Sequence, residues 1–111
     1  MDLQTLVTPV VVVLPEEIDL SNADSILQQL RSAFSRGVTV VIADMTSTAF
    51  CDILGCRNLL SAHDDAEASG VQLRLVIHPG GVRRVLKLLG FDRLLSVYPS
   101  LESARTGDSA L

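Results

Sequence analysis

The chain has 111 residues, of which 48% are hydrophobic and 20% are charged, a composition typical of a folded globular domain and not of a disordered segment. Nine Lys and Arg against thirteen Asp and Glu give a net charge of −4, so we expect no nucleic-acid partner, because phosphate binding requires a basic face. The length fits one domain over residues 1–111, with a core at about residues 8–105 and a frayed tail at 106–111.

The cysteines and the N-terminal residues indicate the compartment. Cys51 and Cys56 are too few for an all-cysteine zinc site and do not indicate a secreted disulfide scaffold. No basic residue precedes the first apolar run, Val10–Leu14, and this run is far too short to span a bilayer. We therefore expect a cytoplasmic protein with no membrane insertion.

The first strand and helix are predicted in the N-terminal third of the chain. Val10–Leu14 is a β-branched run ended by Pro15, which is typical of a strand buried on both faces, and residues 3–7 offer an additional edge strand through Leu3, Leu6 and Val7. Ser21 and Asp24 resemble a capping box at the start of a helix that Gly37 ends. The apolar face of this helix has residues at helical spacing: Ala23, Ile26, Leu27, Leu30 and Phe34.

A second strand and a second helix follow. Residues 38–43 form a buried apolar strand ended by Asp44, residues 46–48 form a polar loop, and Phe50-Cys51 can extend briefly. From Asp52 the spacing becomes helical until Gly70. One face of this helix collects Cys56, Leu59, Leu60, His63 and Ala66.

The last third of the chain repeats the alternation. Residues 71–77 alternate as a third strand ended by Pro79-Gly80-Gly81, and a short helix over residues 82–89 ends at Gly90. Val97-Tyr98 is a candidate fourth strand, and residues 100–105 allow one or two final helical turns. The order predicts an α/β fold with a mainly parallel sheet of about four strands, an optional N-terminal edge strand, and crossover helices.

Signals for catalysis are absent from the sequence. It contains no Gly-x-Ser-x-Gly elbow, no His-Glu-x-x-His pair and no phosphate-binding P-loop, so we expect no catalytic residue, metal site or cofactor. His63 is expected to be a packed or half-exposed structural residue, and His78 has no acidic partner nearby in sequence. Cys56 is expected to be a buried inert thiol, which leaves Cys51 as the better candidate for modification.

Two acidic residues follow the predicted strand ends. If the strands are parallel, Asp19 and Asp52 lie at one edge of the sheet, where α/β proteins usually bind ligands. Each residue is equally compatible with a role at a helix start, where a carboxylate favours the macrodipole. The Pro79-Gly80-Gly81 turn fits either a phosphate-binding loop or a plain strand-to-helix connection.

Three segments together resemble a known family. Residues 17–21 are Glu-Ile-Asp-Leu-Ser, residues 38–44 are Val-Thr-Val-Val-Ile-Ala-Asp, and residues 50–56 are Phe-Cys-Asp-Ile-Leu-Gly-Cys. They resemble the STAS domain of anti-sigma factor antagonists, which has Gly-Glu-Leu-Asp, a helix, a hydrophobic strand ending in Asp-Leu, and Phe-Ile-Asp-Ser-Ser-Gly-Leu. Residues 82–92 and 100–104 resemble the later family elements, so the resemblance covers about residues 8–105.

The resemblance implies a bacterial regulatory domain that binds and does not catalyse. In regulatory members, the domain docks on an ATP-binding serine kinase that doubles as an anti-sigma factor, and so frees the sigma factor. We therefore expect a protein partner, first a serine-kinase-type anti-sigma factor, with a second copy of the chain as a further candidate. The expected partner-binding residues lie in two loops and the helix starts that follow them: Asp19, Leu20, Ser21, Asn22, Asp52, Ile53, Leu54, Gly55 and Arg57.

This sequence departs from the family at the regulatory position. In the family, the kinase phosphorylates the Ser directly after the motif Asp, and the added charge expels the domain. That position here is Ile53, and Leu54 replaces the second Ser, so we expect no phosphorylation at residue 53 and at least one of these two side chains exposed. Glu16 replaces the glycine that usually precedes the Glu-Leu-Asp turn.

Three functions stay open at this point. The first is an anti-sigma factor antagonist that binds without phosphorylation control. The second is a STAS subunit of another assembly, such as a partner of a lipid-transport ATPase or a stress-signalling scaffold. The third is a small enzyme or nucleotide-binding protein that uses Asp19, Asp52 and the Gly80-Gly81 turn. The resemblance favours the first two over the third.

Overall fold

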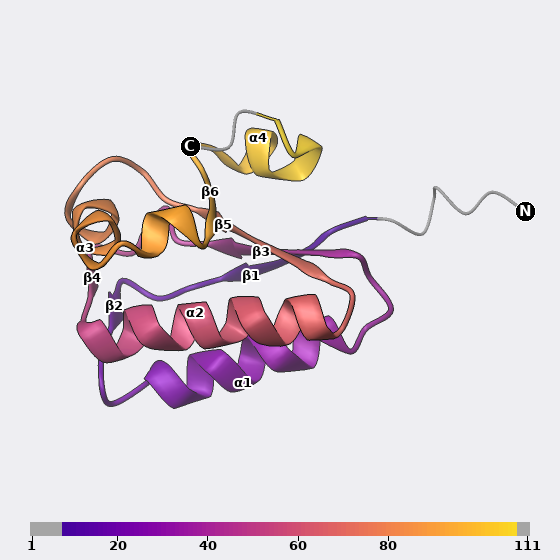
Figure 1. Ribbon diagram of the computed structural model, residues 1–111, viewed down its shortest axis with the longest axis horizontal. Coiled ribbons are helices and arrows are strands. Elements are labelled where there is room, and N and C mark those ends of the chain that lie inside the picture. The colour runs from indigo at the N-terminus through magenta and orange to yellow at the C-terminus, as the bar shows by residue number, and fades with distance from the viewer. Residues whose placement is uncertain (1–7, 109–111) are drawn as a thin grey trace, which may run out of the picture.

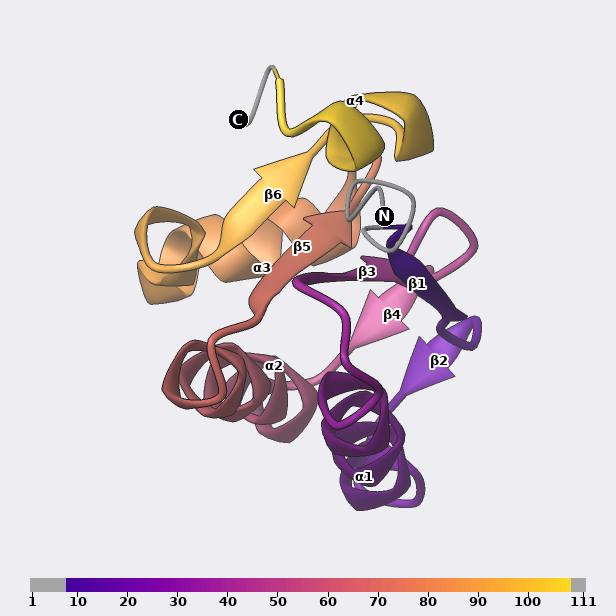
Figure 2. The same ribbon diagram turned by 90° about the vertical axis from the view of Figure 1, so that its right-hand side faces the viewer.

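Four parallel strands form the central sheet, in the order β1-β3-β5-β6 (Figures 1 and 2). The computed structural model describes residues 8–108. The strands are β1 (Val10–Val13), β3 (Val40–Asp44), β5 (Gln72–Val76) and β6 (Ser96–Tyr98). Each neighbouring pair is parallel, so the connections between them must cross over, and the predicted α/β fold is confirmed. The edge strand predicted from Leu3, Leu6 and Val7 lies outside the described residues.

Helices cover both faces of this sheet. Helices α1 (Ala23–Phe34) and α2 (Ile53–Ala68) pack against one another on one face, while α4 (Leu101–Thr106) covers the other face (Figure 1). Helix α3 (Gly81–Leu89) contributes Val82 and Leu86 to the same core as α1 and α2. A short 3-10 turn, η2 (Phe91–Arg93), then leads into β6. All five apolar residues predicted for the α1 face are buried.

Strand β1 is less buried than its sequence predicts. Among residues 8–108 it pairs with β3 alone, and so it forms an edge of the described sheet. Val10, Val11 and Val12 are half-buried, whereas Val13 is 68% exposed. The prediction of a strand buried on both faces is therefore wrong for β1, because a β-branched run indicates a strand and does not indicate its place in the sheet.

The start of α1 also differs from the prediction. Asn22, and not Ser21, is the N-cap residue, and its side chain makes no capping hydrogen bond. The Ser21 hydroxyl instead donates to the Asp19 carboxylate, so it is not free to form a capping box with Asp24. The Asn22 side chain accepts from the Asp19 N–H and donates to the Glu17 carbonyl, which closes the preceding turn.

A second, smaller parallel sheet joins two connections. Strands β2 (Glu17–Ile18) and β4 (Phe50–Cys51) pair with Ile18 opposite Cys51. The brief extension predicted at Phe50-Cys51 is confirmed, and β2 was not predicted. Both Ile18 and Cys51 are buried, which fixes this small sheet to the core.

The C-terminal segment is more ordered than predicted. Thr106 is the last residue of α4, and Gly107 caps that helix with a φ of 78°, a conformation that favours glycine. Ser100 begins α4 with a reciprocal capping box to Ser103. The prediction of a frayed tail is therefore wrong for residues 106 and 107, and residues 109–111 lie outside the described part of the chain.

Candidate functional site

The two loops that sequence analysis selected lie side by side at one end of the molecule (Figure 1). Strand β2 leads into Asp19–Asn22, and β4 leads into Asp52 and the start of α2. Because β2 and β4 are paired, the residues that follow them emerge together. The Asp52 N–H donates to the Ile18 carbonyl at 3.0 Å and so continues the pairing beyond the strands.

Asp19 is held in a tight turn by its own neighbours. Its carboxylate accepts hydrogen bonds from the Ser21 hydroxyl and from the Ser21 N–H, the latter at 2.9 Å. These bonds favour the ionised carboxylate, so the hydroxyl and then the backbone N–H lower the pKa of Asp19 below its ordinary value. Asp19 therefore shapes the loop and carries a fixed negative charge at neutral pH.

We expect Ser21→Ala to raise the pKa of Asp19 toward its ordinary value, because the mutation removes the hydroxyl that favours the carboxylate. The rise should be partial, since the Ser21 N–H bond remains. An NMR titration of the Asp19 carboxyl measures the change. Ser25→Ala, at an exposed position on α1, is the matched control, and an Asp19 pKa that is equal in Ser21→Ala and wild type would contradict this assignment.

Asp52 begins α2. Its side chain accepts a hydrogen bond from the Gly55 N–H at 2.8 Å, and its backbone is extended, as an N-cap residue requires. The structure thus gives Asp52 the helix-start role, one of the two interpretations that the sequence left open. The carboxylate is half-buried beneath the exposed end of the helix.

Gly55 allows α2 to approach β2 and β4 closely. A Cβ at this position would lie 2.7 Å from the Cys51 sulfur and 2.7 Å from Cγ2 of Ile18. These distances are shorter than van der Waals contact, so only glycine fits without movement of the neighbours. Gly55 is buried, so it can hold α2 in place beneath a partner-binding surface without itself contacting the partner.

The two cysteines are buried directly beneath this end of the molecule. The Cys51 and Cys56 sulfurs lie 3.7 Å apart, and both thiols are free. Hydrogen bonding with the Cys56 thiol and burial raise the pKa of the Cys51 thiol. The expectation that Cys51 is the better candidate for modification is wrong, because Cys51 is 3% exposed; the expected burial of Cys56 is confirmed.

Four large apolar side chains are exposed on β4, on the loop after β2 and on the first turn of α2. We call this group the apolar end patch, and it consists of Leu20, Phe50, Ile53 and Leu54. Leu20 is 79% exposed, Phe50 52%, Ile53 54% and Leu54 36%, so both residues of the Ile53-Leu54 pair face solvent. Sequence analysis did not select Phe50. The alternation of a two-residue strand with Cys51 buried would have placed Phe50 on the opposite, outer side.

The remaining selected residues flank this patch. Arg57 is exposed on the next turn of α2, and Ser21 is exposed beside Leu20. Asn22 is half-buried because its side chain closes the turn before α1. Four of the nine selected residues have side chains exposed to solvent and able to contact a partner: Leu20, Ile53, Leu54 and Arg57. Three others, Asn22, Asp52 and Gly55, fix the backbone conformation of the two loops and of the start of α2.

The two histidines have different environments. His63 is half-buried on α2, with Nε2 3.7 Å from Oε2 of Glu67, and the ligating atoms of His63, Asp64 and Glu67 lie within 4.8 Å of one another. However, Nδ1 of His63 is buried and has no hydrogen-bond partner among residues 8–108, and metal coordination through Nε2 would place a proton on that nitrogen. A packed structural histidine, as predicted, fits better. His78 is exposed beside Pro79.

Comparison with protein-family models matches residues 1–104 of the chain to the STAS domain. The chain belongs to the STAS domain family. The STAS domain is 33% identical over 94 residues to Rv2638 of Mycobacterium tuberculosis, which is named as a proposed anti-anti-sigma factor. The match spans 79% of this chain and 61% of that protein, so the STAS domain covers less than two thirds of that relative's length.

Solved structures share the fold of this STAS domain. An anti-sigma factor antagonist from Mycobacterium paratuberculosis has a TM-score of 0.79 at 23% identity, over 87% of this chain and 82% of that chain. SpoIIAA, an anti-sigma factor antagonist in its unphosphorylated form, has a TM-score of 0.72 at 21% identity, over 94% of this chain and 91% of that chain. Within residues 8–108 of the STAS domain, we find no helix with the length and apolar character needed to cross a membrane.

Proposed function

We propose that this STAS domain is a non-catalytic cytoplasmic module that acts like an anti-sigma factor antagonist, through a serine-kinase-type anti-sigma factor as its protein partner. The observation that carries the proposal is the apolar end patch, because three large apolar side chains, Leu20, Phe50 and Ile53, are each more than half exposed on β4 and on the segments that follow the paired strands β2 and β4. The 33% identity to a relative named as a proposed anti-anti-sigma factor supports the same partner class.

The proposed complex lacks the family's phosphorylation switch at residue 53. Ile53 has no hydroxyl, so a partner kinase cannot add a phosphate at this position. Its exposed side chain instead adds apolar area to the proposed interface. Regulation then depends on the amounts of the two proteins or on the nucleotide state of the partner.

Affinity capture from the native host tests this function. We expect the wild-type domain to retain an ATP-binding serine kinase of the anti-sigma class, identified by mass spectrometry. Ile53→Asp and Leu54→Asp should each weaken the binding of that kinase by about tenfold or more, because each places a charge in an apolar contact. Titration calorimetry with the purified kinase measures the affinities.

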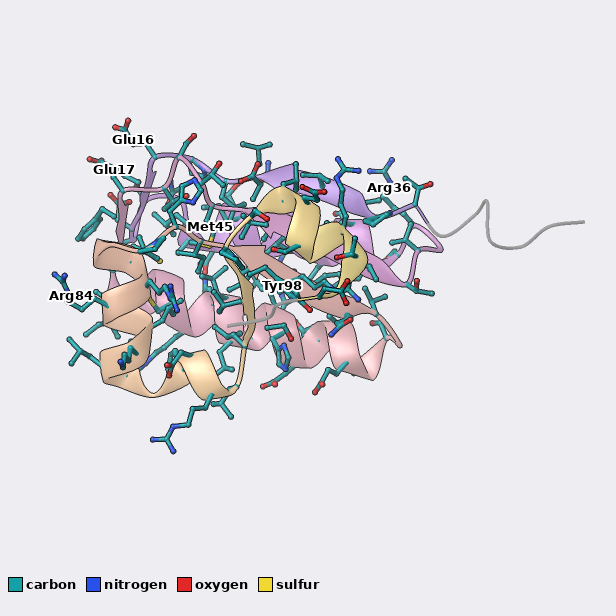
Figure 3. All side chains as sticks on the ribbon, turned by 90° about the horizontal axis from the view of Figure 1, so that it is seen from above. Glu16, Glu17, Arg36, Met45, Arg84 and Tyr98 are labelled. Carbon is teal, nitrogen blue, oxygen red and sulfur yellow. The ribbon has the colours of Figure 1, made fainter. Side chains whose placement is uncertain are left out.

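The matched control is Arg36→Asp, which changes an exposed residue at the opposite end of the molecule (Figure 3). Its affinity for the kinase should equal that of wild type, and circular dichroism should show that all three variants remain folded. Undiminished binding by both Ile53→Asp and Leu54→Asp would exclude the apolar end patch as the docking surface.

The loss of the hydroxyl at residue 53 also favours a second candidate function. A STAS subunit of another assembly, such as a lipid-transport ATPase or a stress-signalling scaffold, has no need of a phosphate acceptor at Ile53. The same capture experiment discriminates between the two functions. If the second function is correct, the wild-type domain would retain transporter or scaffold subunits and no kinase, and Ile53→Asp would reduce the recovery of those subunits.

A further inference from the structure

The end of the molecule that carries the apolar end patch has acidic and basic groups on opposite sides. Strand β2 and its flanks carry Glu16, Glu17 and Asp19 on one side of β4. Helix α3 lies on the other side of β4, and an added Cβ on its first residue, Gly81, would meet the Ala49 carbonyl at 3.9 Å. Figure 2 shows β4 between α3 and β2.

Helix α3 is a basic element in an acidic protein. It contains Arg83, Arg84 and Lys87 and no acidic residue, while the whole chain has a net charge of −4. These three cations line a shallow hollow of about 350 Å³ together with Pro79 and Gly80. Figure 3 shows Arg84 at the same end of the molecule as Glu16 and Glu17, on the other side of that end.

None of these charges takes part in an ion pair among the described residues. The ion pairs among residues 8–108 join Arg31 to Asp65 and His63 to Glu67, far along α1 and α2 from this end. Glu16, Glu17, Arg84 and Lys87 are all exposed, and none of them takes part in these pairs. The arrangement of these four charges on an acidic side and a basic side therefore adds no ion pair that would stabilise the monomer.

We propose that this end of the domain binds a second copy of the chain, as a twofold symmetric dimer centred on the apolar end patch. A twofold rotation about an axis through Phe50 and Ile53 places the acidic side of one copy against the basic side of the other. In this arrangement Glu17 of each copy faces Arg84 of its mate, and the exposed apolar side chains meet at the centre. A surface with this layout is complementary to itself, which an isologous interface requires.

The interaction is weak and sensitive to salt. The apolar centre is small, which places the dimer among transient contacts, with a dissociation constant of the order of 100 μM. The net charge of −4 opposes association only weakly, because the Debye length is about 8 Å at physiological ionic strength and the opposite charges meet at closer range.

Self-association has a consequence for regulation, which rests on the proposed function. The dimer buries Ile53 and Leu54, the residues that the proposed partner contacts, so a domain cannot hold a second copy and a partner at once. Dimers would store the domain at high concentration and release it as the partner captures monomers.

Charge reversal tests the dimer without any partner, by sedimentation equilibrium of the full chain at physiological ionic strength. Wild type should approach twice the 11.9 kDa monomer mass as its concentration rises toward about 1 mM. Glu17→Lys and Arg84→Glu should each weaken association by about tenfold, because each change affects two symmetric contacts. The Glu17→Lys/Arg84→Glu double variant should regain wild-type association, since the exchanged charges still face one another.

The control variant Arg36→Glu carries the same change in net charge as Arg84→Glu but at the opposite end of the molecule, and it should associate as wild type does. A monomer mass for wild type over the whole concentration range would overturn the proposal. It would also be overturned by association that neither single reversal weakens, or by a double variant that stays as weak as the single ones. These measurements use no kinase, so a failure of the kinase capture would contradict the proposed function and leave the proposed dimer untouched.

Discussion

Replacing Ile53 with serine is expected to create a phosphorylation site in this domain. The serine would follow Asp52 and precede Gly55 by two positions, as in the family pattern, at the exposed start of α2. A phosphate there would meet the favourable N-terminus of a helix and also the negative Asp52, so its effect should fall on binding more than on the fold. Incubation of Ile53→Ser with the proposed partner kinase and ATP, followed by mass spectrometry, locates the phosphate.

The unmodified Ile53→Ser domain should bind the kinase, and phosphorylation should weaken that binding by at least tenfold, because about two negative charges enter the interface. Ile53→Ala is the matched control, since it removes the same apolar side chain and adds no acceptor. Efficient phosphorylation of the wild-type chain would contradict the assignment. Ser47 is exposed and would be the first residue to examine, whereas the Thr48 hydroxyl donates to the Pro15 carbonyl at 2.8 Å.

Gly55→Ala is expected to destabilise the fold by about 2 kcal/mol. The new methyl group would lie 2.7 Å from the Cys51 sulfur and from Cγ2 of Ile18, and both neighbours are buried in the core. The better helix propensity of alanine offsets only about 1 kcal/mol of this cost. Chemical denaturation of wild type and variant measures the free energy of unfolding.

Removal of one colliding atom should reduce this cost. In a Cys51→Ala background, which lacks the sulfur, we expect Gly55→Ala to cost about 1 kcal/mol less than in wild type, because the methyl then meets only Ile18. Equal costs in the two backgrounds would show that α2 shifts away from β4 as a whole. Equal stability of Gly55→Ala and wild type would show that the close approach at this position carries no constraint.

The sequence was sufficient to predict the fold class and the longer strands and helices. Apolar alternation and helical spacing locate β3, β5, α2 and α3, because these elements are buried and their patterns are unambiguous. The sequence left Asp52 open between a ligand-binding position and a helix start, and the structure shows that it is the N-cap of α2. Ile53 and Leu54 are adjacent on the predicted helix and therefore point in different directions, which predicts that at least one of them is exposed. Both are exposed in the structure.

Features that depend on contacts between distant segments could not be predicted from local patterns. The two-residue strands β2 and β4 are too short to show a period, so the small sheet that brings Asp19 and Asp52 together was missed, and Phe50 with it. The role of Gly55 depends on Ile18, which is far away in sequence. Ser21 suits an N-cap equally well in sequence, and only the turn formed by Asp19 decides against it.

The small β2–β4 sheet has a consequence for how this domain can change its binding preference over evolutionary time. Its buried members, Ile18 and Cys51, hold the backbone of both loops, while Leu20, Phe50 and Ile53 project outward and contribute little to the core. Substitutions at the outward positions therefore change the proposed docking surface at almost no cost in folding free energy. Hydrogen bonds already hold the backbone beneath them, so docking at this surface would order few additional backbone dihedrals. Gene duplicates could diverge in partner choice through these three positions alone.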